Sequence, residues 1–295
     1  MKMTVKTKLA TILAATCLTL LLTGWSVSAY AGPTDLLMGN PSQAKADTAQ
    51  KDNFLMEKSH YTLSYNNGKG TPNWVSWHLS KKDLGNAPRK AFHPDESLPR
   101  GFTQITPKDY TDGGFDRGHM CPHSDRSADD DMSYETFLMS NMIPQSPDVN
   151  QKAWAQLEMY CRNLVENEHD TLYIVDGPAG QGGTGRNGFK QTVGNTHQVV
   201  VPAKCWKVIM VLGEGPGSDL NKVNEHTRII AVIMPNDMTV GEGWAGFRVS
   251  VKDVEALTGY KFFDKVPAAI IGPLKERVDD VAIAKVKPIV HGGGE

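Results

Sequence analysis

The sequence has no long apolar run, few cysteines and no marked excess of either charge. Its longest apolar stretch, residues 9–22, is shorter than the roughly 20 residues that a membrane-spanning helix needs. Four cysteines among 295 residues exclude a disulfide-dense scaffold. The 31 basic and 33 acidic side chains exclude the strongly basic composition of a tight nucleic-acid binder. The composition that remains, 40% hydrophobic and 22% charged, is that of a soluble globular protein.

Residues 1–31 have the pattern of a signal peptide. Three lysines precede the apolar stretch, and Ala29-Tyr30-Ala31 supplies a cleavage site with small residues at its two key positions. We therefore expect cleavage near Ala31 and a secreted or periplasmic protein without stable membrane association, with a retained anchor as the alternative. Cleavage leaves 28 basic against 33 acidic side chains, a formal charge of −5. A polyanionic substrate would then have to be attracted locally, by a few placed arginines and a cation.

The remaining chain is expected to form one domain of the α+β class. Residues 32–51 are interpreted as a loose N-terminal arm, 52–285 as the domain, and 286–295 as a flexible tail. Apolar alternation predicts strands at 61–65, 74–79, 172–175, 198–202, 206–212 and 228–234. The first two are expected to form a hairpin, and 198–202 is expected to pair with 206–212. Helices are predicted at 150–165, 251–257 and 275–284. Together these patterns predict a mainly antiparallel central β-sheet flanked by helices.

Reactive side chains concentrate in Asp116-Arg117-Gly118-His119 and in the predicted helix that begins at Asn150. At about 100° per residue, Asn150, Glu158 and Arg162 share one face of that helix. A histidine can take a proton from water near neutral pH. An amide oxygen and a carboxylate suit a hydrated Mg²⁺, and a guanidinium grips phosphate. This combination is that of phosphodiester hydrolysis, whereas a solvated face with a Glu158–Arg162 ion pair is the simpler alternative.

These motifs resemble the DNA/RNA non-specific endonucleases, which are ββα-metal nucleases, and most closely their secreted cyanobacterial members. The resemblance rests on Asp116-Arg117-Gly118-His119, on Ser140-Asn141-Met142-Ile143-Pro144-Gln145 and on the helix from Asn150 to Glu158. Similar segments, including Asn86-Ala87-Pro88-Arg89, extend it over roughly residues 36–270. The resemblance implies a ββα-metal active-site motif within the α+β fold.

The resemblance also implies a role for each matching residue. His119 corresponds to the general base that activates water, and Asn150 to the direct ligand of Mg²⁺. Glu158 corresponds to the carboxylate that holds the waters of that ion, while Arg89 and Arg162 correspond to the side chains that hold the phosphate. Three further residues correspond to supports that shape the site: Asp116, Arg117 and Asn141. The implied cofactor is Mg²⁺, with Mn²⁺ as a candidate substitute.

The implied substrates are DNA and RNA, single- and double-stranded, with 5′-phosphorylated products. A host inhibitor protein is a further candidate partner, and a monomer is favoured. Two other functions stay open from the residues alone: a non-catalytic nucleic-acid-binding module, and a hydrolase that uses Cys121 as its nucleophile. The sequence does not decide between a Cys161–Cys205 disulfide and three buried thiols.

Two further patterns resemble a dinucleotide site and a zinc site, but each lacks part of the required sequence signature. Residues 183–188 fit G-x-G-x-x-G, but no helix is predicted to follow, so a loop is favoured over a dinucleotide site. His123 and Cys121 lack the spaced partners of a zinc site, so a surface His123 is favoured.

Overall fold

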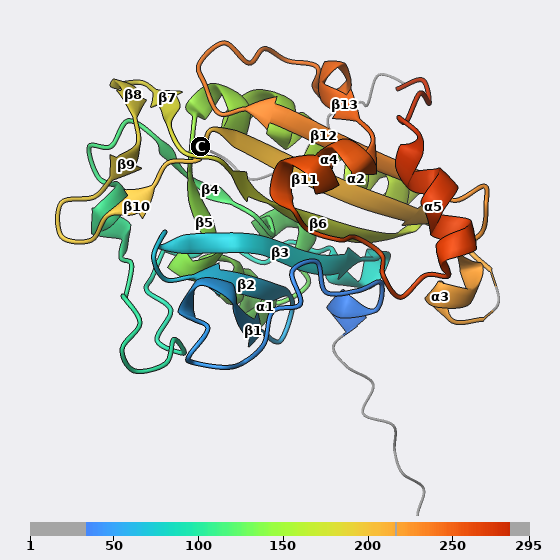
Figure 1. Ribbon diagram of the computed structural model, residues 1–295, viewed down its shortest axis with the longest axis horizontal. Coiled ribbons are helices and arrows are strands. Elements are labelled where there is room, and N and C mark those ends of the chain that lie inside the picture. The colour runs from blue at the N-terminus through green and yellow to red at the C-terminus, as the bar shows by residue number, and fades with distance from the viewer. Residues whose placement is uncertain (1–33, 216, 284–295) are drawn as a thin grey trace, which may run out of the picture. The chain divides into compact units, whose positions relative to one another are not determined.

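The computed structural model describes residues 34–215 and 217–283 (Figure 1). The signal peptide and the tail predicted from the sequence lie outside these residues. In the described part of the chain, no helix combines the length and the apolar character needed to cross a membrane.

A seven-stranded sheet forms the centre of this unit, in the order β1-β2-β3-β6-β11-β12-β13 (Figure 1). All pairings between these strands are antiparallel. The strands are β1 (Phe54–Glu57), β2 (Thr62–Asn66), β3 (Thr71–Leu79), β6 (Thr171–Ala179), β11 (Lys204–Leu212), β12 (Arg228–Pro235) and β13 (Arg248–Val249). The α+β class with a mainly antiparallel sheet is therefore confirmed.

Three small two-stranded ribbons, five α-helices and several short 3-10 or π-helical segments complete the described fold. The ribbons are β4 (Asp116–His119) with β5 (Met142–Gln145), β7 (Gly183–Gly185) with β8 (Gly188–Lys190), and β9 (Thr192–Val193) with β10 (Val199–Val200). The helices are α1 (Asp130–Thr136), α2 (Ala155–Asn167), α3 (Asp219–Lys222), α4 (Val251–Thr258) and α5 (Ala268–Glu276). The β4–β5 ribbon and the α2 region that follows it in sequence supply two strands and a helix, as the ββα motif requires.

The two faces of the sheet pack against different helices because side chains alternate along each strand. In β11, Cys205 and Ile209 join the apolar cluster that contains α2 residues, and Trp206 and Val208 join the cluster that contains α4 and α5 residues. Lys207 is on the α2 face of this central strand and is 1% exposed. A cation that is buried at that position needs a negatively charged partner nearby.

Three expectations about single elements were wrong. Residues 199–200 pair with β9, because β11 is already paired along its length with β6 and β12. The last helix is Ala268–Glu276 and not 275–284, and it includes Pro273 within it. The helix expected from residue 150 begins with a π-helical segment, Val149–Trp154, before α2.

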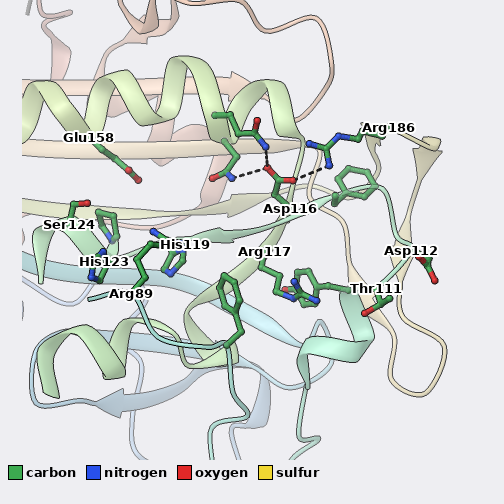
Figure 2. Close-up of a pocket in the computed structure, with 16 residues that line it drawn as sticks. Arg89, Thr111, Asp112, Asp116, Arg117, His119, His123, Ser124, Glu158 and Arg186 are labelled. Carbon is green, nitrogen blue, oxygen red and sulfur yellow. Dashed lines mark hydrogen bonds and ion pairs between the residues drawn. The ribbon is translucent and has the colours of Figure 1, made fainter. Parts of the chain in front are cut away.

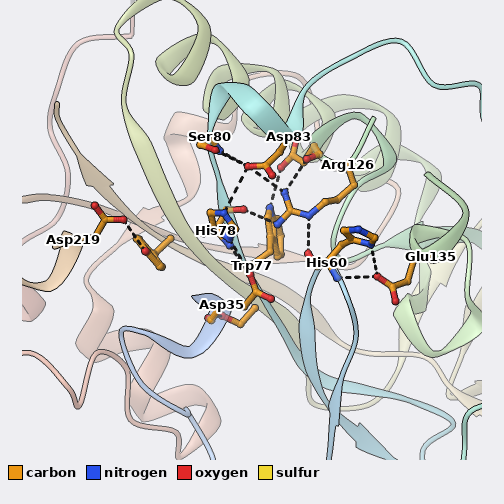
Figure 3. Close-up of polar contacts among 12 residues, drawn as sticks. Asp35, His60, Trp77, His78, Ser80, Asp83, Arg126, Glu135 and Asp219 are labelled. Carbon is orange, nitrogen blue, oxygen red and sulfur yellow. Dashed lines mark hydrogen bonds and ion pairs between the residues drawn. The ribbon is translucent and has the colours of Figure 1, made fainter. Parts of the chain in front are cut away.

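Residues 34–51, expected to be loose, instead lie against the sheet. Ser76 Oγ donates to the Asp35 carbonyl at 2.6 Å, and the Asp35 carboxylate lies 3.1 Å from His78 Nδ1 (Figure 3). Buried Arg126 donates to the carbonyls of His60 and His78, each at 2.6 Å. The bonds of Asp35 join residues 34–51 to β3, and those of Arg126 join the segment after β4 to the same strand. The N-terminal residues that the structure describes are therefore part of the packed structure.

Candidate active site

One pocket of about 540 Å³ collects most of the residues predicted from the sequence (Figure 2). Of the seven predicted site residues, five line it: Arg89, Arg117, His119, Asn150 and Glu158. Asn141 and Arg162 are not among its lining residues. The pocket therefore joins the β4–β5 ribbon to the helical segment that follows it, as a ββα site requires.

His119 is the last residue of β4, and its ring packs against two aromatic rings that also contact each other. The ring centroids of Phe137 and Phe92 lie 4.9 and 5.3 Å from that of His119. The preceding residue, Gly118, pairs with β5, where a Cβ atom would collide with Gln145 Oε1 and lie 2.6 Å from Gln145 Cβ. Gly118 thus lets the two strands approach closely and fixes the backbone that presents the imidazole.

Burial keeps the His119 imidazole neutral. Desolvation, with smaller contributions from the positive charges of Arg89 and His123, lowers the pKa of His119 to about 3. The buried Nε2 atom has no hydrogen-bond partner among the described residues. The imidazole is therefore unprotonated over the whole neutral range, so its free nitrogen is available to act as a base.

Asn141 fixes the chain immediately after His119 from outside the pocket. Its Oδ1 accepts from the Cys121 amide at 3.0 Å, and its Nδ2 donates to the carbonyls of Cys121 and Thr136 at 2.8 and 2.9 Å. Its main-chain carbonyl also accepts from the Met120 amide at 3.0 Å. The fully buried Asn141 is therefore a positioning residue for β4.

The amide of Asn150 is oriented by Asp116, the first residue of β4. Asn150 Nδ2 donates to Asp116 Oδ2 at 3.0 Å, and Gln151 Nε2 donates to the same oxygen at 2.7 Å. The π-helical segment places these two consecutive side chains on one carboxylate; such segments are frequent at functional sites. Because the nitrogen of the Asn150 amide is engaged, its oxygen is the atom left to bind a ligand.

Glu158 is the carboxylate of the pocket on α2. Burial raises its pKa to about 7, although the positive charges of Lys207 and Arg162 lower it. Lys207 Nζ lies 4.0 Å from Glu158 Oε1 and 3.0 Å from the fully buried Asp176. The ammonium also lies 5.0 and 4.5 Å from the ring centroids of Trp77 and Trp154. The buried ammonium of Lys207 thus lies close to the Glu158 carboxylate.

Arg162, predicted to hold phosphate, is directed elsewhere in this structure. Its Nη1 donates to Asp125 Oδ1 at 2.9 Å, and its side chain is 10% exposed. Asp125 also accepts from Trp77 Nε1 at 3.1 Å. The 100° per residue used to place Asn150, Glu158 and Arg162 on one face does not apply to the first turns, Val149–Trp154, because these turns are π-helical. Arg162 acts on the pocket through its charge, which favours the ionised form of Glu158.

Three guanidinium groups line the pocket, and one of them was not predicted. Arg89 is exposed, and its Cζ lies 5.1 Å from the Phe137 ring centroid, close to His119. Arg117 Nη2 donates to the Pro107 carbonyl at 2.8 Å, which leaves it less free to meet a substrate. The unpredicted cation is Arg186, at the turn of the β7–β8 ribbon. The glycine-rich stretch 183–188 indicated a loop, but no sequence signal placed it beside β4.

The burial of the described cysteines argues against a hydrolase that uses Cys121 as its nucleophile. The three described cysteines, Cys121, Cys161 and Cys205, are buried free thiols. Burial raises the pKa of the Cys121 thiol well above its usual value, so this residue is neither accessible nor ionised as a nucleophile. Among the described residues, no group of three His, Cys, Asp or Glu side chains could cage a metal.

The model of the DNA/RNA non-specific endonuclease family matches residues 38–269, which is most of the chain. The chain belongs to this family. The endonuclease is 44% identical over 246 residues to a nuclease of Nostoc sp., a match that covers 83% of this chain and 86% of that protein. It is 33% identical to nuclease C1 of Cunninghamella echinulata, over 81% of this chain and 91% of the other.

Two further relatives are less similar in sequence to the endonuclease than the Nostoc nuclease is. The human mitochondrial nuclease EXOG is 35% identical over 214 residues, which are 70% of this chain and 55% of EXOG. A chain in the crystal structure of the EndoG/EndoGI complex superposes with a TM-score of 0.65 at 27% identity, over 81% of this chain and 96% of that one. The resemblance inferred from the sequence motifs is therefore confirmed, and the endonuclease is a DNA/RNA nuclease.

Proposed function

We propose that the endonuclease uses Mg²⁺ to hydrolyse phosphodiester bonds of DNA and RNA, leaving 5′-phosphates. The observation that carries the proposal is the convergence of His119, Asn150 and Glu158 on one pocket, although they come from β4, the π-helical segment and α2. Mn²⁺ is a candidate substitute, because both ions accept the same oxygen ligands.

The residues of the pocket fit a hydrated divalent cation. Asp116 holds the Asn150 nitrogen and leaves the amide oxygen free, and Glu158 supplies a carboxylate in the same pocket. Mg²⁺ accepts few protein ligands and keeps several waters. Asn150 would be the direct ligand and Glu158 would accept hydrogen bonds from those waters. When bound, the ion would neutralise charge that develops on the phosphate and on the leaving 3′-oxygen.

Side chains of the protein act as the general base and hold the phosphate of the substrate. His119, neutral because it is buried, takes the proton from the attacking water. Arg89, exposed beside His119, holds the scissile phosphate through charge-assisted hydrogen bonds. Asp116, Arg117 and Asn141 support the geometry of the site, and the charge of Arg162 favours the ionised form of Glu158. All of these contacts are made with phosphate, so they do not depend on the sequence of the nucleic acid.

Incubation of the purified endonuclease with plasmid DNA and with RNA, in Mg²⁺ and then in excess EDTA, tests the proposal. We expect cleavage of both polymers in Mg²⁺, 5′-phosphate ends on the products, and loss of cleavage in EDTA. Cleavage that survives EDTA would contradict the cation-dependent mechanism. Binding without cleavage in Mg²⁺ would favour a non-catalytic module.

Export and inhibition are separate parts of the proposal. The leader pattern of residues 1–31 supports secretion or delivery to the periplasm. N-terminal sequencing of the exported protein should find a chain that begins shortly after Ala31. The superposed structure is that of the EndoG/EndoGI complex and concerns the mechanism of EndoG inhibition, which supports an inhibitor protein as a partner of the endonuclease as well.

A further inference from the structure

The pocket has two exposed guanidinium groups, and the proposed reaction uses only one of them. Figure 2 shows Arg89 near His119 and His123, whereas Arg186 lies beside Asp116, away from them. The 57% exposed side chain of Arg186 can reach solvent, and therefore a ligand in the pocket. A polynucleotide brings a row of phosphates, of which the chemistry at His119 needs one.

Arg186 is held in the pocket by its main chain and not by its side chain. The Arg186 amide donates to the Gly114 carbonyl at 2.8 Å, and Asn187 Nδ2 donates to the Asp112 carbonyl at 3.1 Å. At Gly185 a Cβ atom would collide with the Gly114 carbonyl oxygen, so the turn needs a glycine for this approach. The β7–β8 turn is thereby pinned to the loop that leads into β4.

The guanidinium itself is free to change partner. Arg186 Nη1 lies 3.5 Å from Asp116 Oδ1, beyond the usual length of a charge-assisted hydrogen bond. Asp116 already accepts hydrogen bonds from Asn150 and Gln151 through its other oxygen. A phosphate can therefore draw Arg186 away and leave the carboxylate satisfied and the Asn150 amide in place.

We propose that Arg186 forms a second phosphate-binding subsite, which takes a phosphate of the same nucleic-acid strand next to the one that is cleaved. This inference rests on the proposed function and adds to it a contact with the polymer. The pinned β7–β8 turn sets the position of the subsite, and the exposed guanidinium supplies its charge. The subsite strengthens binding of chains with several phosphates and takes no part in bond cleavage.

Steady-state cleavage of a single-stranded DNA octamer in Mg²⁺ tests the subsite. For Arg186→Ala we expect KM to rise about tenfold with kcat within twofold, because a phosphate contact is lost and the reacting groups are kept. The slope of log KM against log salt should fall by about 0.7, the value for one single-strand phosphate contact. Arg186→Lys keeps the charge and should keep the salt slope.

Arg277→Ala is the matched control, since it removes the same charge from an exposed residue directly after α5, and Figure 1 shows α5 on the other side of the view from β7 and β8. This variant should behave as the wild type. Unchanged KM and salt slope in Arg186→Ala would overturn the proposal. A fall in kcat without a rise in KM would also overturn it, because Arg186 would then act on the chemistry through Asp116.

A binding measurement separates this proposal from the proposed function. Fluorescence anisotropy of the labelled octamer in EDTA reports affinity without cleavage, and Arg186→Ala should weaken it about tenfold while Arg277→Ala should not. If the wild type failed to cut the octamer in Mg²⁺, the proposed function would fail, and the anisotropy result would still decide the subsite. Equal affinity of all three proteins in EDTA would contradict the subsite alone.

Discussion

At the scale of single residues, the geometry of the site depends on Asp116, whose two carboxylate oxygens have different partners. Oδ2 accepts from Asn150 and Gln151, and Oδ1 faces Arg186. The amide orientation of Asn150 therefore depends on a residue that is not expected to touch the cation. The sequence identified Asn150, but it did not show that the first residue of β4 orients it.

Replacement of Asp116 by Ala should weaken Mg²⁺ binding about 10–100-fold, because a lost partner that orients a metal ligand typically costs this much. Calorimetric titration of the protein with Mg²⁺ in the absence of substrate measures the effect. Asp280→Ala, which removes an exposed carboxylate outside the pocket, should bind as the wild type does. An unchanged affinity in Asp116→Ala would mean that Asn150 is oriented by other contacts or does not bind the ion.

At the scale of elements, α2 meets the sheet through charged groups as well as apolar ones. Lys207 on β11 lies between Asp176 on β6 and Glu158 on α2. Burial alone would lower the pKa of Lys207, but Asp176 and then Glu158 raise it to about 12. The ammonium is therefore charged at neutral pH, and it offsets the negative charge that the strand and the helix bring together.

Lys207→Met should lower the free energy of unfolding by about 3–5 kcal/mol, because it leaves Asp176 buried without a cation. Urea unfolding measures the loss. The double variant Lys207→Met/Asp176→Asn removes both charges of the pair and should be more stable than the single variant. A loss below about 1 kcal/mol in Lys207→Met would show that the buried pair contributes little.

The elements themselves were largely predictable, whereas their partners were predicted only in part: the hairpin of β2 and β3 was expected, but the pairing of 199–200 was not. Runs of apolar and β-branched residues at 61–65, 74–79 and 206–212 predicted strands close to those observed at 62–66, 71–79 and 204–212, which are buried along nearly their whole length. The pairing of 199–200 was missed because local pattern does not show that both edges of β11 are occupied. Helix α5 begins seven residues before the predicted start at 275, and it includes Pro273, with Ile271 and Leu274 packed into the core on either side.

For the site as well, local patterns identified single residues but not the contacts between distant segments. His119, Asn150, Glu158 and Arg89 were found because their chemistry and family spacing are visible in the sequence, and they line one pocket. Arg186 and the orientation of Arg162 depend on long-range contacts, with Gly114 and with Asp125. No local signal reports such contacts.

At the scale of the whole molecule, the buried neutral His119 links folding to pH. Its pKa is about 3 in the folded protein and near 6.5 in an unfolded chain. The unfolded state therefore binds the extra proton first as the pH falls. The stability associated with His119 is fully present above about pH 6.5 and is lost between pH 6.5 and about 3.

His119→Asn should accordingly flatten the pH dependence of stability in that window. The wild type should lose up to about 1.4 kcal/mol per pH unit more than the variant, the most that one titrating group can contribute. Urea unfolding midpoints at pH values from 8 down to 4 would show the difference, with the two curves parallel above pH 7. Parallel curves throughout would mean that the imidazole is not buried as a neutral group.

The most direct test of the central claim is the rate of plasmid cleavage by His119→Ala in Mg²⁺, measured beside wild type and an exposed-site control, His226→Ala. We expect the His119 variant to lose about 10²–10⁴-fold in rate, as for loss of a general base, while its calorimetric affinity for Mg²⁺ and the activity of the control stay unchanged. Cleavage by His119→Ala at a rate close to that of the wild type would contradict the assignment of His119 as the base that activates water.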